Sequence, residues 1–380
     1  MHVDFGYDED EQIRLLMSDF RDIVNYCIQR AVENKISSFV KLWHLVKEEI
    51  RHKWNYACQI YVQAVRVACS ILKTWRKRVK KEEADPNNPP QIKRLFVKLH
   101  QSLYRFTGDR LRITIKKGVH IWIDLRFGDY QKRFIERWKK GKMKIGEIII
   151  NEEKIIVPFK KEVELIEPKN WMAVDINECN VTGVSSDGRW FIIDTSEVKR
   201  IRHVYFEKRR RIQVDIKTGK RRKELLRKYG KREKNRIKDI LHKVSKTIVE
   251  FAKLRGSGII LEDLKGIRKR INFNRIMNRR LHIGWAFRKL QSYIVYKAKL
   301  EGLPVVYVNP KGTSSHCPKC GEKLAPNGQW REKVCKKCDI VWNRDLVACL
   351  NLLKMWGVCV TPECLPMNLR QVFNHPSSKT

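Results

Sequence analysis

Four cysteines and three carboxylates are the residues of this sequence whose types and spacing could do chemistry. The cysteines form two Cys-x-x-Cys pairs, Cys317 with Cys320 and Cys335 with Cys338, joined by a turn-rich stretch. Each pair can aim two thiolates at one point, and two pairs complete the tetrahedron that zinc prefers. Because four thiolates leave no open coordination position, the pattern predicts a structural zinc site rather than a catalytic one. Four unrelated free cysteines are the alternative.

The carboxylates are Asp175, Glu262 and Asp345, which lie far apart in the sequence. Carboxylates brought together repel one another unless divalent cations lie between them, and hard oxygen ligands favour Mg²⁺ or Mn²⁺. Two such ions about 3.5–4 Å apart can activate water and neutralise the leaving oxygen in phosphodiester hydrolysis. Asp175 is the natural bridging ligand, with Glu262 and Asp345 each completing the shell of one ion. As an alternative, a lone acid is more often a helix cap than a ligand, and Asp345 could cap its own helix.

Two of these acids are placed on predicted strands of one sheet. The runs that indicate its strands are residues 172–177, 181–186, 189–194, 258–262 and 304–308. The first run contains Asp175 and leads into a hairpin with an Asp-Gly turn. The fourth is a continuous apolar run closed by Glu262, which is typical of a buried parallel strand whose carboxyl end faces a site. Asp263, the neighbouring acid, is expected to point to the opposite face.

Two helices are expected to complete this sheet, over residues 285–300 and 344–356, and Asp345 falls in the first turn of the second. Strand, hairpin, strand, helix, strand and helix, with acids in these places, is the layout of an RNase H-like fold. His242 and His316 are isolated in the sequence. We expect them to form local hydrogen bonds rather than to act as general bases.

The N-terminal half is predicted to be helical at first and then rich in strands. Helical periodicity covers residues 8–33 and 39–81, and a proline-rich break follows at 82–90. Runs with a period of two then indicate short strands at residues 95–99, 111–116, 119–125, 148–151 and 154–158. The expected architecture is a small β-barrel or half-barrel into which the helical segment 8–81 is inserted or to which it is appended.

The charge of the chain points to a polyanionic partner. Its 81 Lys and Arg against 42 Asp and Glu give a formal net charge of +39, for which nucleic acid is the default ligand and a ribosomal or membrane-surface role the alternative. Residues 199–246 hold 21 Lys and Arg against 5 acids in a mostly helical pattern. That density is typical of a polyphosphate-binding segment, although a long, solvated helix pair would look similar.

Composition also bounds the environment. An odd total of 11 Cys, with no basic and apolar leader at the N-terminus, indicates a reducing compartment. No run of about 18 apolar residues is present, so no membrane span is predicted. High Lys, Arg, Glu and Ile usage hints at a thermophile. We therefore expect a prokaryotic cytoplasmic protein, associated with the nucleoid and from a thermophilic archaeon.

The C-terminal motifs resemble those of TnpB, the OrfB-type family of transposon-encoded proteins that is ancestral to the type V CRISPR effectors. The matching runs are Glu262-Asp-Leu-Lys-Gly-Ile, Trp285-Ala-Phe-Arg-Lys-Leu, Thr313-Ser-Ser-His-Cys-Pro-Lys-Cys-Gly and Asn343-Arg-Asp-Leu-Val-Ala. The resemblance covers residues 170–356 closely. Two positions depart from the family, which usually has Asp in place of Asn343 and Asn in place of Val347.

The resemblance implies an RNA-guided DNA endonuclease. By position, Asp175, Glu262 and Asp345 match the catalytic triad of the family, and the four cysteines match its zinc ligands. The implied cofactors are structural zinc, two Mg²⁺ or Mn²⁺ ions and a guide RNA from the transposon end. The implied target is double-stranded DNA beside a short adjacent motif, and a transposase of the same element is a further expected partner.

The resemblance also implies a domain order. A wedge barrel with a helical recognition insert at about 8–95 would occupy residues 1–165. The two parts of a split RuvC-type nuclease domain would be 166–311, including the basic helical segment 199–250, and 342–360. A zinc ribbon would occupy 312–341 and a mobile tail 361–380. The basic residues expected to face nucleic acid are Arg66, Arg76, Lys77, Arg78, Arg209, Arg210, Arg221 and Arg222.

Two other functions stay open at this point. The first is an RNA-guided DNA-binding repressor that has lost cleavage, which we would expect to lack at least one triad acid. The second is a basic zinc-ribbon nucleic-acid binder with no catalytic site. All three acids are present in this sequence, which favours the nuclease.

Overall fold

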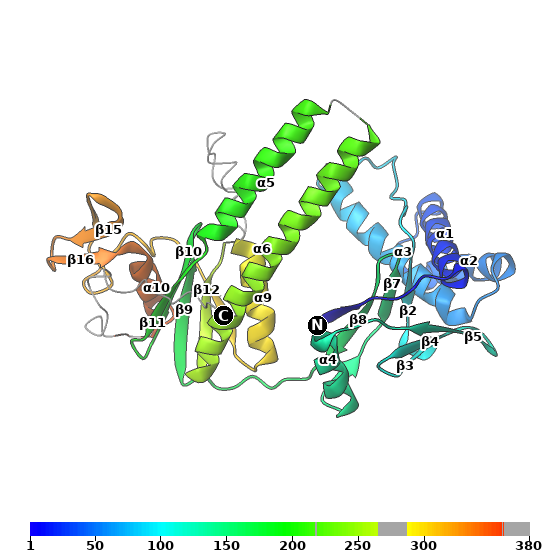
Figure 1. Cartoon of the computed structure of the whole chain (residues 1–380), viewed down its shortest axis with the longest axis horizontal. Helices are drawn as coiled ribbons and strands as arrows, with labels where there is room; N and C mark the ends of the chain where they lie inside the picture. The colour runs from blue at the N-terminus through cyan, green and yellow to red at the C-terminus, as the bar shows by residue number, and fades with distance from the viewer. Residues whose placement is uncertain (217–218, 265–286, 359, 361–380) are drawn as a thin grey trace. The chain divides into compact units, whose positions relative to one another are not determined.

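A computed structural model describes residues 1–216, 219–264, 287–358 and 360 of the chain (Figure 1). The chain divides into two compact units, Met1–Glu162 and Val163–Thr380. In the part of the chain that the structure describes, no helix is long and apolar enough to cross a membrane. The predicted mobile tail at 361–380 lies outside the described residues.

The first unit combines helices with two β-sheets. Its helices are α1 (Glu11–Glu33), α2 (Phe39–Lys53), α3 (Cys58–Val79) and α4 (Asp129–Lys139). One sheet has the order β1-β8-β7-β2, with β6 also paired to β8. Its strands are β1 (His2–Phe5), β2 (Phe96–Leu99), β6 (Lys144–Ile145), β7 (Ile148–Asn151) and β8 (Lys154–Lys160). The other is β3-β4-β5, formed by β3 (Tyr104–Phe106), β4 (Arg110–Lys116) and β5 (Val119–Asp124).

Several boundaries in this unit follow from local chemistry. The side chain of Asp10 accepts a hydrogen bond from the backbone N–H of Ile13 and so caps α1. The helix expected over 39–81 is instead two helices, because the chain is extended at Trp54 and at Ala57. Strand β1 was not predicted, since its four residues are too few to show a period without their partner β8. Helix α4 was missed as well.

The second unit is built on one mixed five-stranded sheet with the order β11-β10-β9-β12-β13. Its strands are β9 (Asn170–Ile176), β10 (Asn180–Ser185), β11 (Trp190–Asp194), β12 (Ser257–Glu262) and β13 (Val305–Val308). The first three are antiparallel neighbours, whereas β12 runs parallel to both β9 and β13. All five runs predicted to be strands form this one sheet. The apolar run at 304–308 suggests a buried strand, but β13 lies at an edge of the sheet and Tyr307 is exposed.

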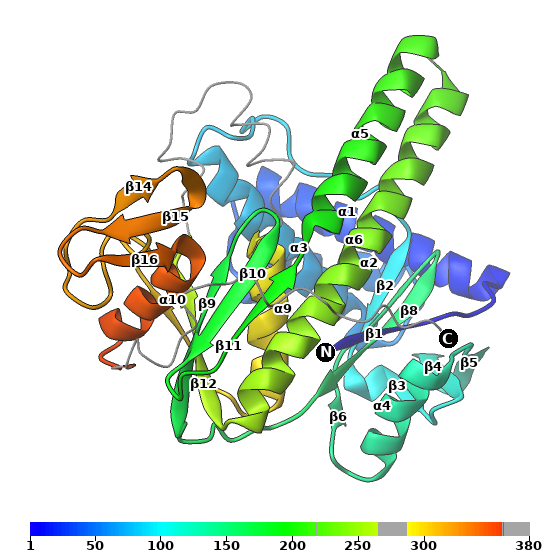
Figure 2. The ribbon, with the colours of Figure 1, turned by 60° about the vertical axis from the view of Figure 1, so that its left-hand side comes forward.

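The two faces of this sheet are covered by different elements. Helices α5 (Ser196–Asp215), α6 (Lys220–Leu254) and α9 (Phe287–Leu300) pack on the face that carries Val174 and Leu261. Helix α10 (Arg344–Met355) packs on the other face, with Ala173 and Ile260 (Figure 2). Because side chains alternate along a strand, Asp175 and Glu262 belong to the α10 face.

A small three-stranded sheet precedes α10. It has the order β14-β15-β16, with β14 (Ala325–Asn327), β15 (Gln329–Cys335) and β16 (Ile340–Asn343). The last residue of β16, Asn343, is followed directly by the first residue of α10. The same stretch of chain therefore leaves the cysteine region and enters the helix that carries Asp345.

Helices α5 and α6 form a hairpin that extends beyond the sheet of the second unit (Figure 1). The buried residues of α5 lie between Val198 and Tyr205, and those of α6 lie between Ile237 and Ala252. The far half of the hairpin therefore has no apolar core of its own. An ion pair between Arg209 and Glu233 and a ring contact between Tyr205 and Tyr229 join its two helices.

Candidate functional site

Two of the predicted acids lie side by side at the carboxyl edge of the central strands. Strands β9 and β12 are parallel, and the last pair in their register is Val174 with Leu261. The next residue on each strand is Asp175 or Glu262, so the two carboxylates leave neighbouring strands at the same level and on the same face. The side chain of Gln291 on α9 donates to the backbone oxygen of Glu262 over 2.9 Å and fixes the end of β12.

The third acid, Asp345, comes from α10 and does not cap that helix. The capping residue is Asn343, whose Oδ1 accepts hydrogen bonds from the backbone N–H groups of Asp345 and Leu346. The alternative in which Asp345 caps its own helix is therefore wrong. The Asp345 carboxylate instead accepts a 2.8 Å hydrogen bond from Nδ2 of Asn180 on β10, and Asp345 is only 4% exposed. Because this carboxylate is not used to cap the helix, it can bind a ligand.

All three acids line one pocket of about 250 Å³ in the second unit. The other residues that line it are Asn177, Leu264, Pro310, Thr313, Ser314, Arg344 and Ala348. The structure thus brings together residues that the sequence holds far apart. The two departures from the family are both accommodated nearby, since Asn343 supplies the helix cap and Val347 is fully buried in the apolar cluster around α10.

Crowding of the carboxylates changes their acidity. Burial raises the pKa of Asp175 well above its usual range, and the charges of Glu262 and Asp345 raise it further. A 2.7 Å hydrogen bond from Asn177 to Asp175 acts in the opposite direction. Burial raises the pKa of Glu262 to about 7, against the hydrogen bond from Thr313. Ionising this cluster is therefore unfavourable until a cation neutralises it, which fits a site for divalent metal.

The amides and the hydroxyl that hold the three carboxylates were not predicted from the sequence. Asn177 holds Asp175, Asn180 holds Asp345, and the Thr313 hydroxyl lies 3.3 Å from Oε1 of Glu262. Only Asn177 carried a local signal, because it follows Asp175 by two residues at the end of the predicted strand. Asn180 and Thr313 reach their acids through tertiary contacts that no spacing reveals.

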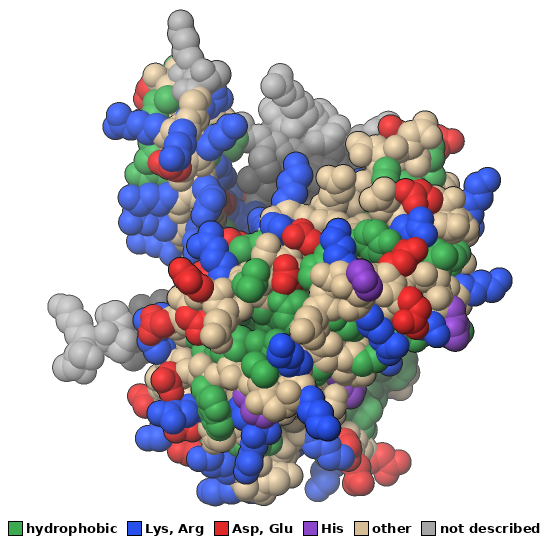
Figure 3. Space-filling model, turned by 90° about the vertical axis from the view of Figure 1, so that its right-hand side faces the viewer, with side chains coloured by type: hydrophobic (Ala, Val, Ile, Leu, Met, Phe, Trp, Pro, Cys, Tyr) green, Lys and Arg blue, Asp and Glu red, His purple; other side chains and the backbone are tan. Residues whose placement is uncertain are grey.

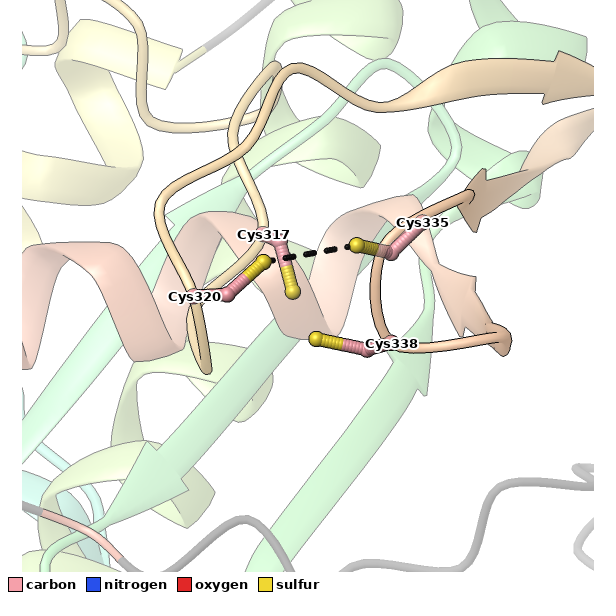
Figure 4. Close-up of side chains that lie close together, drawn as sticks. All are labelled: Cys317, Cys320, Cys335 and Cys338. Atoms are coloured by element: carbon pink, nitrogen blue, oxygen red, sulfur yellow. Dashed lines mark hydrogen bonds between the residues drawn. The ribbon is translucent and has the colours of Figure 1, made fainter.

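The four cysteines converge as predicted (Figure 4). Their sulfur atoms all lie within 4.8 Å of one another, and among the described residues they are the only group of His, Cys, Asp or Glu that does so. Cys317 and Cys335 are buried and Cys320 and Cys338 are partly exposed. The backbone N–H of Glu322 lowers the pKa of Cys320 to about 7, and a hydrogen bond with Cys320 raises the pKa of Cys338 to about 12. Four thiols that share protons at such short range fit one tetrahedral zinc ion.

Several other polar residues of this unit have local partners. Asp187 accepts from the backbone of Arg189 in the β10–β11 turn, and Glu178 forms an ion pair with Lys199. The ring of His242 stacks on Tyr293 with centroids 4.1 Å apart. Nδ1 of His316 is within hydrogen-bond distance of a backbone oxygen of its own loop. None of these side chains lines the carboxylate pocket.

The predicted nucleic-acid residues differ in what they contact. Arg76 donates to the backbone oxygen of Ile36 over 2.7 Å, and Arg209 is paired with a nearly buried Glu233, so both guanidinium groups have partners within the protein. Arg210 is 70% exposed and only 3.7 Å from Glu207. Lys77, Arg78 and Arg221 are exposed, and Arg78 donates to a backbone oxygen in the following turn. Arg66 is exposed as well, with its guanidinium over the ring of Phe39, whereas Arg222 is partly buried. Arg76 and Arg209 thus also make contacts within the protein, and the prediction that they face nucleic acid stays a prediction.

A cationic row on the outer face of β3-β4-β5 was also missed. Arg105 is the register partner of Arg112, and Arg112 is the partner of Trp122, whose side chain is 54% exposed. The guanidinium of Arg112 lies 6.0 Å from the centre of the Trp122 ring. Two arginines opposite each other destabilise a sheet unless an anion lies across them. Strand periodicity could have predicted this row, since the residues alternate with buried Leu111, Ile113 and Ile121.

Comparisons with known proteins place these features in a family. A family model described as "Cas12f1-like, TNB domain" matches residues 287–352, and one described as "Uncharacterized protein MJ0013 family" matches residues 16–114. The chain is 43% identical over 266 residues to TnpB-like protein MJ0751 of Methanocaldococcus jannaschii, a match that covers 66% of this chain and 92% of that protein. It is 30% identical over 225 residues to the CRISPR-associated endodeoxyribonuclease Cas12f1 of Syntrophomonas palmitatica, which covers 55% of this chain and 44% of that protein.

Solved structures share the fold at low sequence identity. The Cas12f1 chain of a Cas12f1-sgRNA-target DNA complex superposes with a TM-score of 0.59 at 14% identity, covering 90% of this chain and 83% of that one. A mini-RNA-guided endonuclease, CRISPR-Cas_phi3, gives a TM-score of 0.57 at 12% identity and covers 97% of this chain and 93% of that one. The mixed α and β multidomain fold is therefore that of these effectors. Together with the extent of the match to the archaeal relative, this shows that the chain belongs to the TnpB-like protein family.

Proposed function

We propose that this chain is an RNA-guided DNA endonuclease of the TnpB type, which cleaves target DNA by two-metal phosphodiester hydrolysis. The observation that carries the proposal is the convergence of Asp175, Glu262 and Asp345 in one pocket at the carboxyl edge of β9 and β12. The relatives support it, because they include a protein named as an endodeoxyribonuclease and a complex with guide RNA and target DNA.

The residues of the pocket have distinct roles in this proposal. When bound, two Mg²⁺ or Mn²⁺ ions supply a metal-activated water and stabilise the leaving oxygen of the cleaved phosphodiester. The charges of Glu262 and Asp345 both act on Asp175, and the three carboxylates together would hold the two ions. Asn177 and Asn180 orient Asp175 and Asp345 through the amide hydrogen bonds described above. Arg344 lines the pocket beside the acids and offers a positive charge to a phosphate.

The rest of the molecule follows the same assignment. The mixed sheet with α10 is the RuvC-type nuclease domain, residues 166–311 and 342–360. The cysteine knuckle at 312–341 is a structural zinc ribbon that contacts target nucleic acid. Residues 1–165 are the wedge barrel with its helical recognition insert. These assignments draw on the fold shared with the effectors, on the match of the TNB description to residues 287–352, and on the cysteine cluster.

Exposed cations are the nucleic-acid contacts in this proposal. Lys and Arg side chains crowd the projecting α5–α6 hairpin, whereas acidic and basic side chains mingle over the rest of the face in view (Figure 3). Pairing between guide and target would supply sequence specificity, so the protein needs only to bind backbone and duplex shape. The row of Arg105, Arg112 and Trp122 adds a platform for a phosphate and an unpaired base.

Cleavage of a guided target tests the proposal directly. The chain is purified with the RNA that it binds during expression, the RNA is sequenced, and double-stranded DNA carrying the matching target is incubated with Mg²⁺. We expect cleavage that depends on both metal and matching sequence, and a guide that maps to a transposon end. Binding of the guided target without cleavage would favour a repressor, and binding without RNA selectivity would favour a general zinc-ribbon nucleic-acid binder. Copurification of a transposase of the same element would support that further partner.

A further inference from the structure

A chain of hydrogen bonds joins the cysteine knuckle to the carboxylate pocket. Its centre is Asn351 on α10, which is only 8% exposed. The side-chain amide of Asn351 donates to the backbone oxygen of Thr313 over 2.7 Å and to that of His316 over 2.8 Å. An amide NH₂ has two hydrogens, so both are used to hold this one loop against the helix.

One end of the chain enters the cysteine knuckle. His316 is followed by Cys317, whose backbone N–H donates to Glu322 and whose backbone oxygen accepts from Gly321. These two bonds close the first Cys-x-x-Cys turn and aim its sulfur atoms at the second pair. A metal ion that holds the four sulfurs therefore also holds the backbone at residue 316.

The other end of the chain reaches a pocket acid. Thr313 is 4% exposed, and its hydroxyl lies 3.3 Å from Oε1 of Glu262 and 3.1 Å from the backbone oxygen of Pro310. A hydroxyl has one hydrogen, so the bond to Glu262 competes with the bond to Pro310; when it is made to Glu262, it favours one orientation of that carboxylate. The position of Thr313 depends in turn on the Asn351 amide, since that amide binds its backbone oxygen.

Helix α10 thus holds two of the three acids in different ways. It carries Asp345 in its own first turn, and it positions Glu262 through Asn351 and Thr313. We propose that Asn351 and Thr313 are positioning residues that couple the zinc knuckle to Glu262, so that zinc bound by the cysteines strengthens divalent-metal binding in the carboxylate pocket. The inference rests on the proposed function, because it takes Glu262 to be a metal ligand.

Coupling of this kind is measured by a double-mutant cycle. Mn²⁺ alone is titrated into the full chain by electron paramagnetic resonance, for the wild type, Asn351→Ala, Cys338→Ser and the double variant. We expect each single variant to weaken Mn²⁺ binding about 10-fold, the usual effect of losing a partner that orients a metal ligand. The double variant should be no weaker than the worse single one, because both changes break the same link.

Additive losses in the double variant would overturn the inference, since the knuckle and Asn351 would then act separately. A wild type that binds no Mn²⁺ would instead contradict the proposed function itself. If Asn351→Ala proves unfolded by circular dichroism, Thr313→Val decides the matter. Thr313→Val should retain zinc but weaken Mn²⁺ binding, and Thr313→Ser, which keeps the hydroxyl, should restore it.

A matched control lies in the same small sheet. Asn327 on β14 donates to Glu332 over 3.2 Å, so its side-chain hydrogen bond stays within the small sheet. Asn327→Ala should therefore leave Mn²⁺ affinity within about 2-fold of the wild type, as expected for a change that touches no shared partner. An equal loss of Mn²⁺ affinity in Asn327→Ala and Asn351→Ala would show that any damage to the ribbon has this effect, and would refute a specific link.

Discussion

The cysteine knuckle and the carboxylate pocket lie in the same unit and differ in how their ligands are assembled. The four thiols come from two short turns within one stretch of chain, and their sulfur atoms all lie within 4.8 Å of one another. The three acids come from two strands and a helix. They lie together only because β9 pairs with β12 and α10 packs on the face of those two strands. One site is local and the other depends on the whole fold.

The two sites also differ in how much their clustered ligands destabilise the metal-free protein. Thiols can be neutral when no metal is bound, so a compact cluster of them is tolerable. Carboxylates at the sheet edge are buried beside one another, and the raised pKa of Asp175 records how unfavourable their ionisation is. A fold maintains such an arrangement at the expense of stability, which is typical of catalytic sites rather than of structural ones.

The largest expected effect is on catalysis at the carboxylate pocket. We expect Asp175→Asn to reduce guided DNA cleavage by more than about 100-fold, because the amide keeps the shape of the side chain but removes the charge that would bridge two metal ions. Guide RNA binding should be unchanged. Single-turnover cleavage measured alongside RNA affinity separates the two.

Asp187→Asn is the matched control for this change. Asp187 lies in the turn of the same sheet and accepts a backbone hydrogen bond that asparagine can also accept. Its variant should cleave like the wild type. Normal cleavage by Asp175→Asn would show that Asp175 is not a metal ligand, and the contrast between the two sites would no longer hold.

A second prediction concerns the knuckle. Cys335→Ser should release zinc and unfold the small sheet β14-β15-β16, because the free energy of zinc binding at a structural site is also free energy of folding. In isolated zinc-binding peptides the apparent free energy of zinc binding is about 10–16 kcal/mol. Zinc content by elemental analysis and hydrogen exchange of residues 312–343 measure the two effects. The first unit should keep its exchange pattern.

The control for loss of a thiol is Cys58→Ser. Cys58 is an exposed cysteine at the start of α3 in the other unit. It should lose no metal. A purified wild type without zinc would end the structural-zinc assignment, whatever the variants do.

The same contrast explains what could be predicted from the sequence. The spacing of Cys317, Cys320, Cys335 and Cys338 was enough to predict the whole knuckle, because its ligands are local in sequence. The short apolar runs of β9 and β12 likewise placed Asp175 and Glu262 at strand ends. The amides of Asn180 and Asn351 could not be assigned, because each acts on a residue brought near by packing alone. Strand β1 and the internal contacts of Arg76 and Arg209 were missed for the same reason.

A third prediction uses the acidity of Glu262. Its pKa is raised to about 7 from an ordinary value of 4.5, so the folded state binds more protons than the unfolded state between these values. The free energy of unfolding of the metal-free protein should therefore fall as the pH rises from about 4.5 to about 7. Glu262→Gln removes this titration and should be more stable than the wild type above pH 7, by on the order of 1–3 kcal/mol.

Urea unfolding of metal-free protein at pH 5 and pH 8 measures this difference. The variant should differ little from the wild type at pH 5 and clearly exceed it at pH 8. Saturating Mg²⁺ should reverse the order at pH 8, because only the wild type retains the full set of carboxylates. Equal stability of the two proteins at both pH values would show that Glu262 is not held in an unfavourable state.

The smallest expected effect is at Asn343, the residue where the two sites meet. Asn343 ends the last strand of the cysteine sheet and caps the helix that carries Asp345. Asn343→Ala should cost about 1 kcal/mol of stability, the usual value of a helix cap, and should weaken Mn²⁺ binding slightly by loosening the first turn of α10. Asn343→Asp should preserve stability, because aspartate caps equally well and its charge suits a helix N-terminus. Since the family usually has Asp at this position, a marked loss of stability in Asn343→Asp would mean that the asparagine amide group has a further partner. Asn343 would then be part of the carboxylate pocket, and not only of the local structure that joins the cysteine knuckle to α10.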